Sequence, residues 1–321
     1  MNSAEKILSV VIVNYNTDLH LNKCLKSLSE SGIKNISEII AVDNNSTDRN
    51  IEKLNSEFPD VKLFLRDVND GFAGGCNYGA ERAEGKYLLF LNPDVQIKGR
   101  SPEILTSFLE KNKDTGIVSG VMYDDSENVQ YFYNEFPSLS WEIDLLISGN
   151  VQNRIDRLNS IRQIKENKNF EADWFHGAFI LISREDFIKA GKFNEEYFMY
   201  YEDVELCYKV KNILNKKIVC IPEFRYYHST KSSLDIEASD DIYIFHLNRS
   251  KLIFLKNYGF LKRSMIYLTG LTNIVTRIII LPFWNKYKGK RAGKLNQLLK
   301  VLKLYLSSSY VRSSKYEFIR G

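Results

Sequence analysis

The chain has 321 residues, 44% of them hydrophobic and 26% charged, which suits one large globular domain or one domain with an appendage. The net charge of +4 is small, and much of the basic excess lies after residue 247; we expect no nucleic-acid partner. Four cysteines without paired spacing (Cys24, Cys76, Cys207, Cys220) argue against a zinc site and favour reduced thiols in a cytoplasmic protein. The N-terminus lacks the pattern of a secretion signal, and no internal repeat is evident.

The first 91 residues alternate between continuous apolar runs and segments with helical spacing of apolar residues. The runs predict buried parallel strands over residues 7–13, 37–42, 61–65 and 87–91. Helices are predicted between them, at about 19–29, at about 49–58 and before Gly85. This order predicts an α/β fold with a mostly parallel, doubly wound, Rossmann-like sheet and right-handed crossovers.

Polar clusters follow the first three strands and should face one crevice, because ligands of open α/β sheets bind at the carboxyl ends of the strands. The first cluster is Asn14-Tyr15-Asn16, and the second begins with Asp43, whose carboxylate can accept hydrogen bonds from a base or ribose. The third is the glycine-rich segment 69–80, which we interpret as a loop whose backbone N–H groups can meet phosphate. Each cluster alone is also typical of helix caps and turns.

The fourth strand stops abruptly at Asn92-Pro93-Asp94, because proline cannot continue a hydrogen-bond ladder. Asp94 is therefore placed just past the carboxyl end of a strand. A carboxylate there can hold a divalent cation, and the cation can hold a diphosphate. The tripeptide by itself also makes an ordinary turn.

Residues 9–16, 42–48, 71–79 and 92–94 resemble motifs of the family 2 glycosyltransferases of GT-A fold, most nearly the bacterial rhamnosyltransferase-like branch. The resemblance covers about residues 7–255, with the motifs in the expected order. It implies a GT-A fold, a nucleotide-diphosphate sugar as donor and Mg²⁺ or Mn²⁺ as cofactor. Asp94 would bind the metal and Asp43 the base. The other implied donor-site residues are Asn14, Tyr15, Asn16, Asn69, Gly71, Gly75, Asn77 and Asn92.

After residue 95 the pattern changes. Residues 101–111 predict a helix with proline in its first turn, and residues 115–122 predict a strand. The sequence leaves open whether segments 141–147 and 155–164 form short helices or a mobile lid on the acceptor side. Residues 172–182 read as a turn entering a buried strand, and in that turn Trp174, His176 and Gly177 resemble the acceptor-side loop of the family. The alternative is a core aromatic residue and a structural histidine.

Glu202 and Asp203 stand at the start of a predicted helix, where acidic residues are also common for purely structural reasons. The family resemblance makes Asp203 the catalytic base and gives Glu202 the part of shaping the site. Burial behind Phe198 and Tyr201 would raise a carboxyl pKa there, whereas the helix end would lower it. The sequence leaves that balance open.

A last short strand is predicted over 217–221, ending at Pro222. His228 resembles a late histidine of the family that supplies a second metal ligand or touches the diphosphate. Lys231 stands where the branch usually has glycine, which leaves the exact part of His228 open.

The C-terminal region differs in composition, and we predict a boundary between a transferase domain, 1–245, and a helical region, 246–321. The nucleotide-sugar half of the domain is about 1–122 and the acceptor half about 123–245. Residues 265–284 are apolar apart from Asn273 and Arg277, and basic residues and an amphipathic segment, 295–306, follow. Arg277 argues against a spanning helix and favours a basic amphipathic segment on an anionic cytoplasmic membrane surface. The alternative is a soluble helical pair packed on the domain or in a homodimer interface.

These patterns predict an inverting glycosyltransferase, peripheral at the inner face of the cell membrane. It would move rhamnose or another hexose to a hydroxyl of a glycan or lipid-linked acceptor in cell-surface polysaccharide synthesis. One alternative is a sugar-phosphate nucleotidyltransferase, which should carry a basic, glycine-rich loop where residues 14–17 stand. The other is a non-catalytic, membrane-associated binding protein on the same scaffold.

Overall fold

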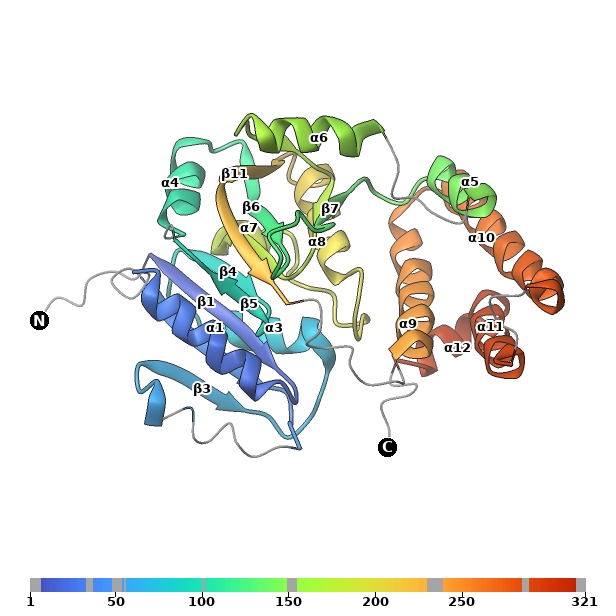
Figure 1. Ribbon diagram of the computed structural model, residues 1–321, viewed down its shortest axis with the longest axis horizontal. Helices are drawn as coiled ribbons and strands as arrows, with labels where there is room; N and C mark the ends of the chain where they lie inside the picture. The colour runs from blue at the N-terminus through green and yellow to red at the C-terminus, as the bar shows by residue number, and fades with distance from the viewer. Residues whose placement is uncertain are drawn as a thin grey trace, which may run out of the picture. The chain divides into compact units, whose positions relative to one another are not determined.

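The computed structural model describes residues 7–32, 37–47, 54, 56–99, 102–148, 155–229, 239–284 and 289–315. The chain forms two compact units, which we call the sheet unit and the helical unit (Figure 1). The sheet unit comprises Met1–Phe136, Leu158–Glu195 and Glu202–Asp235. The helical unit comprises Pro137–Arg157, Glu196–Tyr201 and Ile236–Gly321, so its boundary falls ten residues before the one drawn from composition and it also takes up two earlier segments.

The sheet unit is built on a nine-stranded sheet, counted over the described residues. Its order is β3-β2-β1-β4-β10-β6-β11-β5, and β8 pairs with β11. The strands are β1 (Leu8–Asn14), β2 (Ser37–Asp43), β3 (Val61–Leu65), β4 (Tyr87–Leu91), β5 (Val95–Ile97), β6 (Thr115–Tyr123), β8 (Phe170–Glu171), β10 (Phe179–Ser183) and β11 (Lys217–His228). Strands β3, β2, β1 and β4 run parallel, as do β6 and β11, whereas β10 is antiparallel to both of its neighbours. The predicted mostly parallel α/β sheet is confirmed.

Continuous apolar runs become the central strands because those strands are covered on both faces. Every residue of β1 and β4 is buried. The helices of this unit are α1 (Asp18–Glu30), α3 (Gly71–Glu81), α4 (Glu103–Lys111), α7 (Arg184–Lys189) and α8 (Glu202–Asn212), and α6 (Ile155–Lys165) begins just before the unit boundary. A short second sheet pairs β7 (Tyr133–Asn134) with β9 (Trp174–Phe175). Most of the helix predicted at 49–58 lies outside the described residues.

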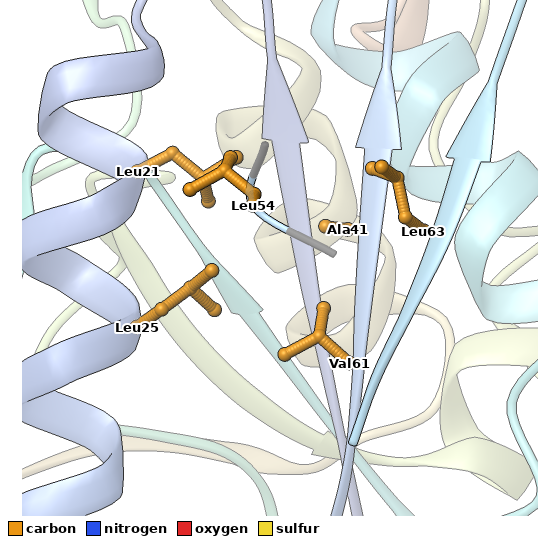
Figure 2. Close-up of a pocket in the computed structure, with 6 residues that line it drawn as sticks. All are labelled: Leu21, Leu25, Ala41, Leu54, Val61 and Leu63. Carbon is orange, nitrogen blue, oxygen red and sulfur yellow. The ribbon is translucent and has the colours of Figure 1, made fainter. Parts of the chain in front are cut away.

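One small pocket in this unit lies between α1 and strands β2 and β3 (Figure 2). Its six lining side chains are all aliphatic: Leu21, Leu25, Ala41, Leu54, Val61 and Leu63. A sugar nucleotide needs hydrogen-bonding partners, which these side chains do not supply. The pocket is therefore a gap in core packing and not the functional site.

The glycine-rich segment is not the phosphate-binding loop that we predicted, because it forms the body of helix α3. A Cβ atom on Gly75 would lie 2.6 Å from Val13, and one on Gly79 would lie 2.5 Å from Val11. The glycines therefore allow the helix to lie directly on strand β1. The sequence pattern reflected close helix–sheet packing, which glycine permits because it lacks a side chain.

The predicted end of the last strand at Pro222 is also wrong, because β11 continues to His228. The pairing of β11 with β6 shifts register between Cys220 and Arg225, which lets the strand pass the proline. This extension places His228 beside β5, paired with Val95. Lys231 lies outside the described residues.

The helical unit consists of α5 (Leu139–Ser148), α9 (Ser239–Phe254), α10 (Phe260–Ile280), α11 (Arg291–Leu306), α12 (Ser308–Ser313) and the short turns η2 (Leu255–Asn257) and η3 (Leu281–Phe283). Segment 141–147 lies in α5 and segment 155–164 lies in α6, so both are helical. A buried ion pair joins Lys251 of α9 to Glu142 of α5 at 2.8 Å. The hydroxyl of Tyr258 also donates to the carbonyl of Pro137 at 2.8 Å. These bonds tie α5 to the C-terminal helices.

Candidate active site

The ends of β1 and β2 carry a closed hydrogen-bond network around Asp43. Oδ1 of Asp43 accepts hydrogen bonds from the Asn14 amide at 2.8 Å and from the Ser46 hydroxyl at 2.5 Å, and Oδ2 accepts one from the Ser46 N–H at 2.9 Å. The Asn16 side chain accepts hydrogen bonds from Thr47. Tyr15, between Asn14 and Asn16 in the chain, is exposed. The predicted nucleotide-sugar-binding residues Asn14, Asn16 and Asp43 therefore come together as one network at the carboxyl edge.

The segment after β3 is held by its own polar side chains. The side-chain oxygen Oδ1 of Asn69 accepts a hydrogen bond from the Gly71 N–H at 3.0 Å at the start of α3. The Asn77 amide donates to the Phe193 carbonyl at 2.9 Å and to Glu195 at 2.8 Å, and its oxygen accepts from the Phe193 N–H. Asn77 thus joins α3 to the loop before α8, and its part in donor binding stays a prediction.

Arg66, which directly follows β3, is a further polar residue at this edge that was not among the predicted site residues. Its guanidinium donates to the Asn44 side chain at 3.0 Å and pairs with Asp70 at 2.7 Å. The guanidinium also lies 5.1 Å from the centre of the Tyr78 ring. A cation at the carboxyl end of a parallel strand was the available signal, because anionic ligands bind at that edge.

Asp94 and His228 meet at the centre of the same edge. Asn92-Pro93-Asp94 makes a tight turn, in which the Val95 N–H donates to the Asn92 carbonyl at 3.2 Å. Oδ1 of the buried Asp94 lies 3.3 Å from Nε2 of His228. Asn92-Pro93-Asp94 therefore forms a turn and also places the Asp94 carboxylate beside His228. The two predicted metal ligands are neighbours.

The His176 and His228 rings lie 5.9 Å apart, centre to centre. Burial lowers the pKa of His176, against the opposing effect of the nearby Asp203 carboxylate. His176 also interacts electrostatically with Asp94, so Asp94, His176, Asp203 and His228 belong to one cluster. Burial therefore favours the neutral form of the His176 imidazole, and the nearby carboxylates favour its charged form.

Asp203 is held at the start of α8 by backbone N–H groups. Its Oδ2 accepts a hydrogen bond from the Gly177 N–H at 2.7 Å. A Cβ atom on Gly177 would lie 3.3 Å from that oxygen and 3.4 Å from Phe72, so this close approach favours glycine. Burial raises the pKa of Asp203, although His176 and the N–H groups of Gly177 and Val204 oppose the shift. The balance left open by the sequence is decided by burial.

Glu202 is buried beside Asp203. Burial raises the pKa of Glu202 well above its usual range, and the adjacent Asp203 carboxylate adds to the shift. Its Oε2 is enclosed and accepts no hydrogen bond from the described residues. Burial thus favours the protonated form of Glu202, whereas the N–H groups that donate to Asp203 favour the ionised form of Asp203. Trp174, half-buried, donates from its indole to the Glu135 carbonyl at 2.9 Å and lies in the strand before His176.

A divalent cation fits the pair Asp94 and His228. They offer one carboxylate oxygen and one imidazole nitrogen, both of which bind Mn²⁺ and related ions. Over the part of the chain that the structure describes, no group of three His, Cys, Asp or Glu side chains could hold a metal. Substrate phosphate oxygens and water would therefore complete the coordination, as is usual where a metal binds together with a diphosphate.

A mostly parallel sheet with acids and histidines at its carboxyl edge is compatible with a nucleotide-sugar glycosyltransferase of GT-A-like fold. Residues 9–190 match the model of Glycosyl transferase family 2, and the chain belongs to this family. It is 28% identical, over 62% of its length and 69% of the relative, to an N-acetylglucosaminyl-diphospho-decaprenol L-rhamnosyltransferase of Mycobacterium tuberculosis.

Two solved structures show the same fold. The mannosyltransferase PcManGT from Pyrobaculum calidifontis, in complex with GDP-Man and Mn²⁺, superposes with a TM-score of 0.55 at 14% identity, over 95% of this chain and 88% of that one. TarS 1–349 of S. aureus, in complex with UDP-GlcNAc, superposes with a TM-score of 0.53 at 14% identity, over 96% of this chain and 88% of that one.

Proposed function

We propose that the protein transfers a hexose, such as rhamnose, from a nucleotide-diphosphate sugar to a hydroxyl of a lipid-linked glycan, with inversion, in cell-surface polysaccharide synthesis. The observation that carries this proposal is the cluster of Asp94, His176, Asp203 and His228 at the carboxyl edge of the sheet. The acceptor class follows the name of the mycobacterial relative, which acts on a sugar linked through diphosphate to decaprenol.

The donor would lie across the ends of β2, β1 and β4. Asp43 and Asp94 follow strands separated by one strand, which corresponds to about 10 Å at the usual spacing between strands. A nucleoside diphosphate can span that distance, with its base side at Asp43 and its diphosphate at Asp94. Asp94 and His228 would hold Mg²⁺ or Mn²⁺, which supplies positive charge to neutralise the departing diphosphate.

The reaction needs one base. Asp203 takes the proton of the acceptor hydroxyl, the acceptor oxygen forms a bond to the anomeric carbon, and the bond from that carbon to the diphosphate oxygen breaks. The nucleoside diphosphate leaves with the bonding electrons. A single displacement of this kind inverts the anomeric configuration and requires no carboxylate nucleophile. The raised pKa of Asp203 makes it a stronger base than an ordinary aspartate.

A thermal-shift panel tests the donor site. We expect nucleoside diphosphates (thymidine, uridine and guanosine) to raise the Tm only in the presence of Mn²⁺, with one base preferred. Asp94→Asn should lower the response to Mn²⁺ and reduce donor turnover on the order of 100-fold, because the metal loses one of its two protein ligands.

Two outcomes would contradict the proposal. The first is release of pyrophosphate from a nucleoside triphosphate and a sugar phosphate, which would indicate a nucleotidyltransferase. The second is full metal-dependent turnover by Asp94→Asn. Glu110→Gln, which removes a surface carboxylate outside this cluster, is the matched control and should respond as the wild type does.

A further inference from the structure

Helix α10 (Phe260–Ile280) exposes a stripe of apolar side chains to solvent. Its members recur every three or four residues and therefore lie on one face of the helix: Leu261, Met265, Leu268, Val275 and Ile279, with Thr272 as the one polar residue among them. Leu261, Leu268 and Ile279 are 72%, 58% and 65% exposed. An apolar row of this length is unusual on the solvent side of a helix, where polar residues are expected. We call this row the α10 stripe.

The opposite face of α10 already packs inside the helical unit. Ile266, Gly270 and Ile274 are buried there. A Cβ atom on Gly270 would lie 2.5 Å from the Tyr305 hydroxyl, and the Tyr267 hydroxyl donates to the Tyr305 carbonyl. The α10 stripe is therefore a second apolar face, and the core of the unit does not account for it.

The rows on either side of the stripe carry a single charged residue, Lys262, at the start of the helix. Ser264, Leu271 and Ile278 stand on one side, and Lys262, Thr269, Thr276 and Ile280 on the other. The seam of a coiled coil between two copies is usually flanked by charged residues that set partner and register. Helix α10 contains no acidic residue that could pair with Lys262 across two copies, so the flanks favour an anionic lipid surface over a second copy of the chain.

The surrounding charge selects the kind of lipid. Residues 251–321 contain fifteen lysines and arginines and one acidic residue, Glu317. Phe283, 83% exposed, and the partly exposed Trp284 follow the end of α10, and aromatic residues of this kind favour the boundary between lipid and water. An anionic bilayer complements both the apolar stripe and the positive charge.

We propose that the α10 stripe docks the protein on an anionic membrane, with α10 lying in the plane of the interface. Residues 260–283 are long and apolar enough to cross a bilayer by length and composition. Crossing, however, would carry Arg277 into hydrocarbon and would expose the packed face of α10, on which Asn273 lies and against which Tyr305 of α11 packs. Lying flat keeps the hydrogen bond of 2.8 Å from Arg277 to Asn273 on the protein side.

Vesicle co-sedimentation of the full chain tests the proposal without donor or acceptor, so its failure is separate from failure of the proposed function. We expect the protein to pellet with vesicles of equal parts phosphatidylcholine and phosphatidylglycerol, and to stay in solution with phosphatidylcholine alone or at high salt. The triple variant Leu261→Ser, Leu268→Ser, Ile279→Ser should bind at least about tenfold more weakly, because the buried apolar area drives insertion.

The matched control is Leu19→Ser, Ile188→Ser, Ile213→Ser. It removes equally exposed side chains, at 81%, 56% and 62%, from the sheet unit, and it should bind as the wild type does. Thermal unfolding checks that both variants are folded. If the stripe variant binds vesicles as tightly as the wild type, the proposal is wrong. A fall from dimer to monomer in the stripe variant alone would assign the stripe to a second copy, and resistance to alkaline carbonate extraction would assign α10 to a span.

Discussion

Buried acids lie at both ends of the strands of the central sheet, the amino edge and the carboxyl edge, but their pKa values shift in opposite directions at the two. At the amino edge, Glu38 of β2 accepts hydrogen bonds from the Ser9 hydroxyl, the Lys62 ammonium and the Glu84 N–H, each at 2.6 Å. Burial pushes the pKa of Glu38 upward, yet these hydrogen bonds together lower it to about 2. At the carboxyl edge, burial raises the pKa values of Glu202 and Asp203.

The difference separates acids that stabilise the fold from acids that are available for chemistry. A carboxyl with a lowered pKa is more strongly ionised in the folded chain than in the unfolded chain, so its charge stabilises the fold above the unfolded pKa. A carboxyl with a raised pKa does the reverse, and its ionisation costs stability as the pH rises above the unfolded pKa. The ionised acids at the carboxyl edge therefore lower the stability of the fold but are available for chemistry, whereas the ionised Glu38 at the amino edge stabilises the fold.

Replacement of Asp203 by asparagine should produce the largest effect. We expect transfer to fall by roughly 10²- to 10⁴-fold, because a general base contributes about that much. The free energy of unfolding at neutral pH should rise, because a buried carboxylate with a raised pKa is removed. Transfer rates and urea unfolding measure the two quantities. Wild-type transfer by this variant would remove Asp203 from the mechanism.

Acid should affect the two edges in succession. Below the raised pKa of Asp203 the base becomes protonated, so kcat/KM should fall about tenfold per pH unit while the chain stays folded. The stability that Glu38 contributes is complete above its unfolded pKa of 4.5 and is lost only as the pH falls toward about 2. A pH profile of transfer beside circular dichroism should show activity lost before structure. Simultaneous loss would contradict the separation of the two edges.

Replacement of Glu38 by glutamine should have the smallest effect, and on stability alone. We expect a loss of about 1–2 kcal/mol in the free energy of unfolding, because the charged hydrogen bonds to Lys62 and the Glu84 N–H are weakened. Transfer should be unchanged. Glu110→Gln is the control, since Glu110 also has a pKa lowered to about 2 but pairs with Lys86 and Lys113 at the exposed surface, where pairs contribute little. Equal destabilisation by both changes would show that burial at the amino edge is unimportant.

Much of the fold and several site residues could be predicted from the sequence. Apolar runs ending in Asn14, Asp43 and Asp94 marked three strands and their carboxyl ends, because a strand covered on both faces admits few polar residues. The family motifs and the helical C-terminal region were equally visible. These features are local, since each depends on a short stretch of neighbouring residues.

Other features depended on contacts between distant residues, and only the tertiary structure decided them. Gly75 and Gly79 read as a loop until their contacts with Val13 and Val11 showed a helix lying on β1. Pro222 read as a strand end until its strand, paired with β6, carried His228 to Asp94. The direction of the shift in the Asp203 pKa depended on burial, and burial is set by what the rest of the chain packs around a residue. The sequence by itself determined which residues could do chemistry, and folding determined which of them meet and in what environment.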